Sequence, residues 1–194
     1  MHRTVFYFSA FLILLLLSQP ICAQKKVERE HRVRKSEVPF SAVEWFNKVY
    51  PGSKKVRWYA EQSSGKSSFE AKTKYKGNLH SVEFSEEGKI EDIEIQREWS
   101  ELPVEVQAEI TKYLTGDYTR QKIRKIQEQW TGPSQRMEKA VAESEPAGVY
   151  IQYEIEYYGV DESTKALWEG LFDQNGSFIE KREIILRPTD NLNY

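Results

Sequence analysis

Hydrophobic and polar residues alternate between positions 69 and 95, and this pattern predicts three short strands. From Phe69 to Tyr75 the charged residues fall on every second position, the period that turns one side of a strand toward a core and the other toward solvent. Glycine-containing turns at 76–78 and 86–88 separate the strands. Because Ile90 is out of phase with Ile93 and Ile95, the third strand should contain a bulge or be covered on both sides. The segment is therefore an antiparallel meander with one apolar face that another element must cover.

Two helices are predicted from a sequence repeat. Ser36-Glu37-Val38-Pro39 recurs 64 positions later as Ser100-Glu101-Leu102-Pro103 (100 − 36 = 64), and both copies lead into apolar residues at helical spacing. Gly52 and Gly116 follow the two helical patterns, where glycine can adopt the left-handed conformation that ends a helix. These apolar stripes are suited to cover the meander.

The chain therefore divides into two αββββ units, residues 36–98 and 100–194. Alternation from Val149 to Tyr157 predicts a long strand in the second unit. Residues 120–130 favour a strand by the logic of the repeat, although Ile123, Ile126 and Trp130 also fit a helix. An insertion at 131–148 contains a short helix or is disordered. The predicted fold class is α+β, with one eight-stranded antiparallel sheet and both helices on one face.

Residues 1–23 are predicted to be a signal peptide. An apolar run from Val5 to Leu17 follows Arg3, and small or polar residues precede Ala23, after which we place the cleavage. The run is shorter than the about 20 residues of a membrane span, so the mature chain should be periplasmic or secreted, without membrane insertion. Cys22 as a lipidated N-terminus is the alternative. Residues 24–35 are dense in mixed charge and predict a flexible tail.

Charge and chemistry narrow the function classes. Removing Arg3 with the leader changes the formal charge from −2 to −3, which favours neither nucleic acid nor an anionic membrane as partner. Of the two remaining histidines, His31 lies in the charged segment and His80 shares its strand phase with Val82 and Phe84, which indicates a partly buried structural role. The sequence predicts no catalytic residues, no metal site and no cofactor.

Tyrosine on the open face of the sheet is the one candidate for binding. The chain has five Trp and eleven Tyr, most of which fall on core positions by phase. The residues predicted on the open face as partner-binding residues are Tyr59, Lys72, Lys74, Tyr150 and Tyr158. Tyrosine mixed with charge suits protein recognition because the ring offers a large contact area with a polar tip, although an ordinary solvated face would look similar.

The chain also resembles a known family. The helix start at residues 36–40, the stop at Tyr50-Pro51-Gly52, the following Val56-Arg57-Trp58 and the second helix opening at Leu102-Pro103 are similar to the PepSY-like, β-lactamase-inhibitor-protein-like (BLIP-like) family of exported bacterial proteins. The resemblance covers roughly residues 36–194. It implies a tandem repeat with a curved sheet whose concave face grips a protein partner, and the insertion at 131–148 departs from a plain repeat.

The expected function is therefore a non-catalytic exported module that binds an unidentified protein or peptide on its sheet, as an inhibitor or a sensor. A binder of a small ligand or a glycan on the same aromatic face is the alternative and would require a pocket. An enzyme is the third class, against which the lack of a nucleophile–base pattern counts.

Overall fold

The computed structural model describes residues 24–26, 28–63 and 65–185. The predicted signal peptide and its cleavage site lie outside the described residues. Ten strands form one sheet in the order β1-β10-β9-β8-β7-β6-β5-β4-β3-β2. Their bounds are β1 Gln24–Lys26, β2 Glu28–Val33, β3 Arg57–Ser63, β4 Lys66–Tyr75, β5 Asn78–Ser85, β6 Ile90–Gln96, β7 Arg120–Thr131, β8 Tyr150–Val160, β9 Lys165–Asp173 and β10 Phe178–Ile184. Neighbours from β2 to β10 are antiparallel, and β1 runs parallel to β10.

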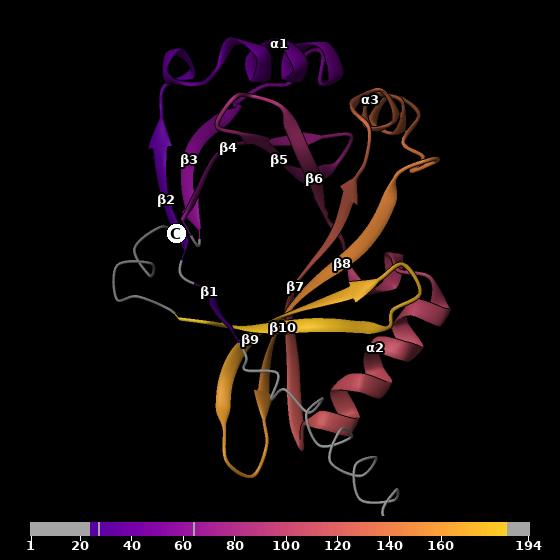
Figure 1. Cartoon of the computed structure of the whole chain (residues 1–194). Helices are drawn as coiled ribbons and strands as arrows, with labels where there is room; N and C mark the ends of the chain where they lie inside the picture. The colour runs from indigo at the N-terminus through magenta and orange to yellow at the C-terminus, as the bar shows by residue number, and fades with distance from the viewer. Residues whose placement is uncertain (1–23, 27, 64, 186–194) are drawn as a thin grey trace, which may run out of the picture.

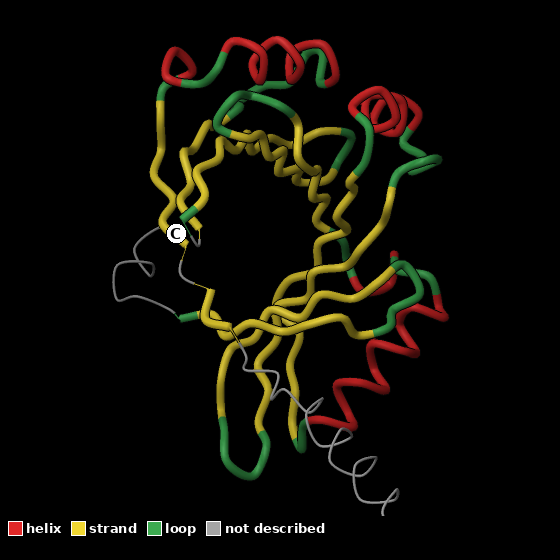
Figure 2. The backbone as a smooth tube through the Cα atoms, in the orientation of Figure 1, coloured by secondary structure: helices red, strands yellow, loops and turns green. Residues whose placement is uncertain are grey.

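The strands of the sheet curl round into a ring, and the helices lie on its outside (Figures 1 and 2). The α-helices are α1 Phe40–Val49, α2 Val104–Asp117 and α3 Ser134–Glu143, and the 3-10 turns η1 Lys35–Glu37 and η2 Trp99–Glu101 precede α1 and α2. The class is α+β, as the sequence predicts. The curl leaves the inner side of the sheet, here called the inner face, without a covering helix among the described residues (Figure 1).

The N-terminal segment supplies two strands that the sequence analysis did not predict. Residues 24–35 were expected to be a flexible charged tail, and the sheet was expected to have eight strands. Instead, β1 extends one edge of the sheet and β2 pairs with β3 at the other edge. Because a single residue separates β1 from β2, this segment joins the two ends of the sheet. Backbone hydrogen bonding needs no apolar side chains, so a charged sequence can cover an otherwise exposed strand edge.

The first half of the core lies between β3–β6 and the helices α1 and α3. Ala42, Phe46 and Val49 point from α1 into a cluster that contains Trp58 and Phe84, all of them buried. The ring of Phe46 lies 5.4 Å from that of Trp58, edge to face. The indole N–H of Trp45 donates to Ser134 Oγ at 2.7 Å, which ties α1 to α3. Apolar burial at helical spacing therefore holds both helices on the outside of the sheet.

The second half of the core lies between β7–β10 and α2. Val106, Ile110 and Leu114 of α2 are buried in a cluster with Tyr157 and Phe172. The two apolar stripes predicted from the sequence thus both face the sheet. The strand predicted at residues 120–130 is confirmed as β7. Of the two alternatives left open for the insertion, a short helix or disorder, the structure has the helix, α3.

Two glycine turns bring the sheet close to the helix starts. Gly88 in the β5–β6 turn has φ +79°, and a Cβ there would lie 2.3 Å from Ser41 Oγ and 2.8 Å from Pro39 Cβ. Gly176 in the β9–β10 turn has φ +82°, and its Cβ would lie 2.7 Å from the carbonyl oxygen of Val106. Both positions need glycine for conformation and for space. The predicted bulge is also confirmed, since the β5–β6 register shifts between Glu83 and Phe84.

Candidate functional site: the inner face of the sheet

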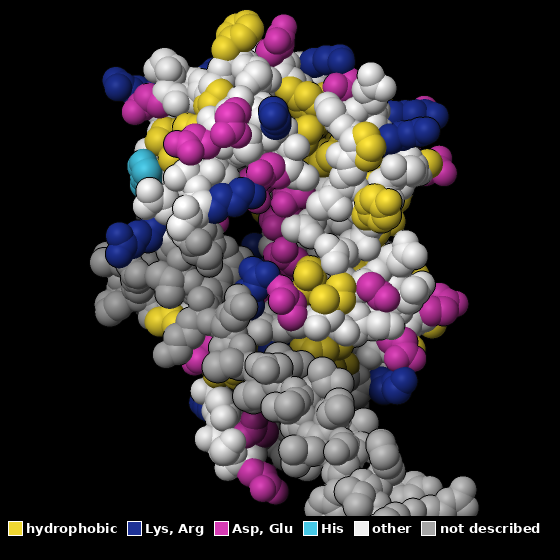
Figure 3. Space-filling model, in the orientation of Figure 1, with side chains coloured by type: hydrophobic (Ala, Val, Ile, Leu, Met, Phe, Trp, Pro, Cys, Tyr) yellow, Lys and Arg dark blue, Asp and Glu magenta, His cyan; other side chains and the backbone are white. Residues whose placement is uncertain are grey.

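Strand alternation places one set of side chains toward the helices and the other on the inner face. Val82, Phe84, Ile93 and Ile155 are buried on the helix side, so their neighbours along the strands point inward. Figure 3 shows acidic and basic side chains around the central hollow. The inner face is therefore a concave, polar and strongly charged surface.

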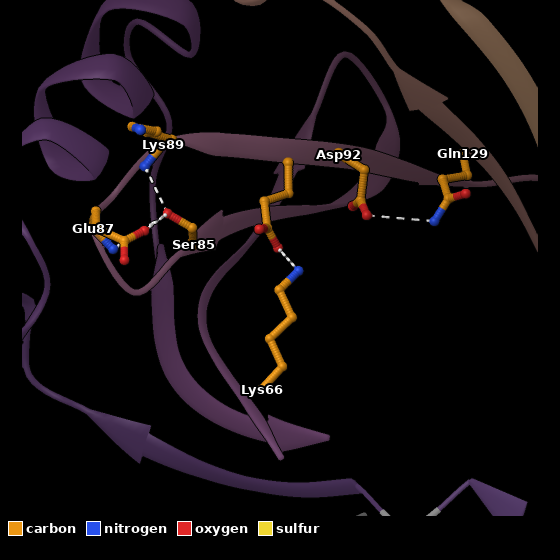
Figure 4. Close-up of polar contacts among 7 residues, drawn as sticks. Lys66, Ser85, Glu87, Lys89, Asp92 and Gln129 are labelled. Atoms are coloured by element: carbon orange, nitrogen blue, oxygen red, sulfur yellow. Dashed lines mark hydrogen bonds and ion pairs between the residues drawn. The ribbon is translucent and has the colours of Figure 1, made fainter. Parts of the chain in front are cut away.

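Carboxyl groups gather at the middle of this face. We call Glu83 of β5, Asp92 and Glu94 of β6, and Glu154 of β8 the carboxylate cluster. Asp92 pairs with Glu83 across β5–β6, and Gln129 of β7 lies between β6 and β8. The amide nitrogen of Gln129 lies 3.1 Å from Glu154 Oε1 and 3.4 Å from Asp92 Oδ2, and Figure 4 shows Asp92 and Gln129 pointing toward one another. Side chains from four neighbouring strands thus meet at one place.

Two carboxyl groups of this cluster, Asp92 and Glu94, have raised pKa values and favour their protonated forms. Burial among protein atoms raises the pKa of Asp92 well above its usual value, and the charges of Glu83 and Glu154 raise it further. Burial likewise raises the pKa of Glu94, as do Glu154 and Asp92, while Lys125 opposes them. Gln127 donates a hydrogen bond from its amide nitrogen to Glu94 Oε2. A carboxyl that keeps its proton can donate a hydrogen bond, which an ionised carboxylate cannot.

A second charged group lies toward the β2 edge. The ammonium of Lys72 lies 2.6 Å from Glu30 Oε2 and 2.9 Å from Glu70 Oε2, and 4.9 Å from the centre of the Tyr59 ring. Burial alone would lower the pKa of Lys72, but the carboxylates of Glu70 and Glu30 outweigh burial and raise that pKa. Glu30, Glu61 and Glu70 each offer an oxygen within 4.8 Å of the others, so they are spaced to share a cation. Lys72 already supplies positive charge to two of these three carboxylates.

The structure separates the five predicted partner-binding residues into groups. Tyr59 and Lys72 are in contact, and Lys74 is exposed two residues further along β4. Tyr150 is 73% exposed and Tyr158 37% exposed, but they lie eight positions apart along β8, a span of about 27 Å at strand spacing. Arg124 lies 5.5 Å from the centre of the Tyr158 ring. These five residues therefore lie on the inner face at two sides of the carboxylate cluster and do not form one compact patch.

The carboxylate cluster is the feature that the sequence analysis missed. Asp92 and Glu94 alternate with Ile93 and Ile95, so the sequence predicts that these two side chains point away from the core. The sequence does not show that β5, β6, β7 and β8 are consecutive neighbours in a curled sheet, which is what brings the four carboxyl groups together. By contrast, the structural role predicted for His80 is confirmed, because this side chain is 7% exposed and its Nδ1 lies 3.2 Å from the Tyr50 hydroxyl.

Comparison with known proteins places the fold. No family model matches the sequence, and no curated protein does. A DUF2874 family protein from Bacteroides ovatus is similar in structure, with a TM-score of 0.55 at 17% identity over 80% of this chain and 98% of that chain. A BLIP-like protein from Bacteroides fragilis has a TM-score of 0.50 at 13% identity over 81% and 92% of the two chains. The fold is BLIP-like.

A third solved structure is a candidate periplasmic protein from Bacteroides eggerthii, with a TM-score of 0.53 at 12% identity, covering 75% of this chain and 88% of that one. At these identities the likeness establishes the fold of the chain and leaves its partner open. None of the described helices has the length and apolarity that a membrane crossing requires.

Proposed function

We propose that this protein is an exported, non-catalytic binding module that engages a protein or peptide on the inner face of its sheet, as an inhibitor or a sensor of that partner. One observation carries the proposal: the inner face is concave, charged and flanked by exposed tyrosines, and no described helix covers it (Figures 1 and 3). The BLIP-like fold supports this use of the face. A concave sheet with rigid aromatic side chains can surround a protruding element of a partner at a low entropic cost.

Export forms the second part of the proposal. The apolar leader at residues 1–23 favours secretion with cleavage after Ala23, and a similar fold occurs in a candidate periplasmic protein. We therefore propose a periplasmic or secreted protein without a lipid on Cys22. Intact-mass measurement of the exported protein checks this, since a chain that starts at a diacylated Cys22 would contradict it.

We further propose that the architecture is a tandem repeat of the PepSY-like type. In both halves a 3-10 turn precedes a helix (η1 with α1, η2 with α2), and a glycine turn packs against the first turns of that helix. Gly88 and Gly176 supply these turns. The helix α3 and the strands β1 and β2 are additions to such a repeat.

The contact residues we propose are Tyr59, Lys72, Lys74, Tyr150 and Tyr158. They lie at the two sides of the carboxylate cluster, so a partner that touches all of them would also meet the carboxyl groups. Such a partner needs basic or hydrogen-bonding groups at its centre, because unpaired buried charge is costly. The inner face therefore favours a partner with a polar protruding segment.

Non-catalytic binding agrees with the placement of the histidines. His80 is bonded to Tyr50 inside the core, and His31 is exposed on the edge strand β2. The alternative, a small-ligand or glycan site among the aromatic residues, would need a pocket there. Two cavities in the described part of the chain, one beside η1 and one beside η2, are not lined by any of the five proposed contact residues.

A pull-down from a native periplasmic extract tests the proposal. The variant Tyr150→Ala/Tyr158→Ala removes two exposed rings, and because surface substitutions usually change stability by within about 0.5 kcal/mol it should remain folded. The matched control, Phe40→Ala/Val104→Ala, removes two side chains that are 78% and 73% exposed at the starts of α1 and α2.

We expect the tyrosine variant to lose the partner by about 30-fold or more, which corresponds to the roughly 2 kcal/mol of an interface hot spot. The control should capture the partner at full strength. Undiminished capture by a folded tyrosine variant would exclude these positions, and loss in the control alone would move the interface to the helices.

A further inference from the structure

We propose that β2 is an autoinhibitory strand, which lies beside the inner face in the free protein and has to leave β3 before a partner can occupy that face. This inference rests on the proposed function, because it concerns the regulation of the same face. The six residues of β2 pair with β3 at one end of the sheet, and β1 pairs with β10 at the other end. The N-terminal strands therefore close the ring of strands around the inner face (Figure 1).

The side chains of β2 engage two of the five proposed contact residues. Arg32 lies directly opposite Tyr59 in the β2–β3 register, so these two side chains are neighbours on the inner face. Glu30 Oε2 lies 2.6 Å from the ammonium of Lys72. Tyr59 and Lys72 are half-buried, whereas the other three proposed contact residues are exposed. A partner that uses Lys72 therefore has to compete with Glu30 for the ammonium.

Little apolar burial holds β2 in place. Its side chains from Arg29 to Arg32 are all exposed, and Val33 at the end of the strand is half-buried. By contrast, β5 in the middle of the sheet buries both Val82 and Phe84 completely. Segments with few buried apolar contacts open locally while the rest of a protein stays folded. Release of β2 from β3 therefore needs no unfolding of the core.

β3 keeps its place when β2 leaves. It pairs with β4 over seven residues. Its Trp58 is buried on the side of the sheet that faces α1, where the ring lies 5.4 Å from that of Phe46. The turn η1 follows β2 directly, and Glu37 Oε2 in this turn accepts the backbone N–H of Arg34 at 2.8 Å. The strand can therefore swing out between Val33 and Arg34 while η1 and β3 stay fixed.

A disulfide between β2 and β3 tests the proposal in the purified chain from residue 24 onward, which has no cysteine of its own. His31→Cys/Ala60→Cys joins two directly opposite residues on the side of the sheet away from the inner face. Directly opposite residues are close enough for a disulfide. The matched control is Gln62→Cys/Ser67→Cys, which joins β3 to β4 on the same side and leaves β2 free.

Hydrogen exchange followed by mass spectrometry measures the opening without any partner. We expect the amides of residues 28–33 to exchange at least about 100-fold faster than those of β5. The β2–β3 disulfide should slow their exchange about tenfold or more, and should also slow labelling of Lys72 by an amine-reactive reagent, whereas the β3–β4 disulfide should change both by less than about twofold. Exchange in β2 as slow as in β5, or no effect of the β2–β3 disulfide on exchange, would overturn the proposal.

Glu30→Gln is an independent variant that does not depend on a disulfide forming. It removes the ion pair with Lys72, so exchange in residues 28–33 and labelling of Lys72 should both become about two- to fivefold faster. The matched control Glu138→Gln removes an ion pair of the same length, that of Lys48 on α1, and should leave both rates as they are. Equal rates in Glu30→Gln and in the wild type would contradict the cover that β2 provides.

Capture of the native partner separates this inference from the proposed function. The closed β2–β3 disulfide should lower capture about tenfold or more, and dithiothreitol should restore it, while the β3–β4 disulfide should have no effect. Equal capture with the β2–β3 disulfide closed and reduced would overturn autoinhibition and leave binding to the inner face intact. Undiminished capture by Tyr150→Ala/Tyr158→Ala would instead count against the proposed function, and the exchange rates would still decide whether β2 opens.

Discussion

Alanine at Gly88 tests whether the β5–β6 turn needs glycine for space as well as for its backbone angle. The residue has φ +79°, and a Cβ there would meet Ser41 Oγ at 2.3 Å, Pro39 Cβ at 2.8 Å and the Ala42 backbone nitrogen at 3.0 Å. Ser41 cannot turn away without cost, because its hydroxyl donates to the carbonyl of Glu87 at 3.1 Å. Substitution therefore has to push the turn away from the start of α1.

Gly52→Ala is the matched control. Gly52 has a similar φ of +75°, but nothing lies within 4 Å of its Cβ position. The left-handed conformation costs about 1–2 kcal/mol for a residue with a side chain, and overpacking at Gly88 adds about 1–3 kcal/mol. We expect losses in the free energy of unfolding of about 1–2 kcal/mol for Gly52→Ala and about 2–5 kcal/mol for Gly88→Ala.

Urea denaturation followed by tryptophan fluorescence measures both losses, and thermal melting should show about 2–4 °C for each kcal/mol. Losses that agree within about 0.5 kcal/mol would mean that the turn tolerates the methyl group. Such a result would contradict the close contact between the β5–β6 turn and the start of α1.

Three further predictions concern stability. Burial, with the nearby charges of Arg97 and Lys76, lowers the pKa of His80 to about 4. As the pH falls, the unfolded state therefore takes up a proton before the folded state does, and the free energy of unfolding should decrease between about pH 6.5 and 4. Urea denaturation at a series of pH values should show this decrease in the wild type and not in His80→Gln. Lys76 donates to the carbonyls of Val141 and Ala142 at the end of α3, so Lys76→Met should lower the free energy of unfolding in urea by about 1–3 kcal/mol. The control Lys48→Met breaks the ion pair of Lys48 with Glu138 and should cost at most about 1 kcal/mol. Equal losses in the two variants would refute this prediction. Burial raises the pKa values of Asp92 and Glu94, so their contribution to the free energy of unfolding should decrease as the pH rises above about 4. Between pH 5 and 8 the free energy of unfolding of Asp92→Asn/Glu94→Gln should therefore change less with pH than that of the wild type. The same pH profile in both proteins would contradict the raised pKa values.

Local periodicity was enough to predict the elements that pack on the core. The alternation from Phe69 to Tyr75 and the register break at Ile90 both report side-chain direction within one strand, and the structure has β4 and the β5–β6 bulge at these places. Phe84, which shares its strand phase with Val82, is fully buried for the same reason. Hydrophobic periodicity in the sequence is therefore sufficient to predict the elements whose structure depends on apolar burial.

Features that depend on pairing between distant segments could not be predicted in this way. Residues 28–33 are almost entirely polar, and their strand is stabilised by backbone hydrogen bonds to β3 rather than by an apolar face. The carboxylate cluster has the same origin, because Glu83 and Glu154 meet only through the strand order β5-β6-β7-β8 and the curl of the sheet. Strand order and curvature are properties of the whole sheet and leave no local pattern.

Covalent footprinting of the protein with its captured partner tests the central claim most directly. Tyrosine and lysine side chains are labelled in the free protein and in the complex, and the modified peptides are quantified by mass spectrometry. If the partner binds the inner face, labelling of Tyr59, Lys72 and Tyr150 should fall in the complex, while Lys48 of α1 and Lys112 of α2 on the outside should be labelled as before. Protection of Lys48 and Lys112 with unchanged labelling of the inner-face residues would contradict the account and place the partner on the helices.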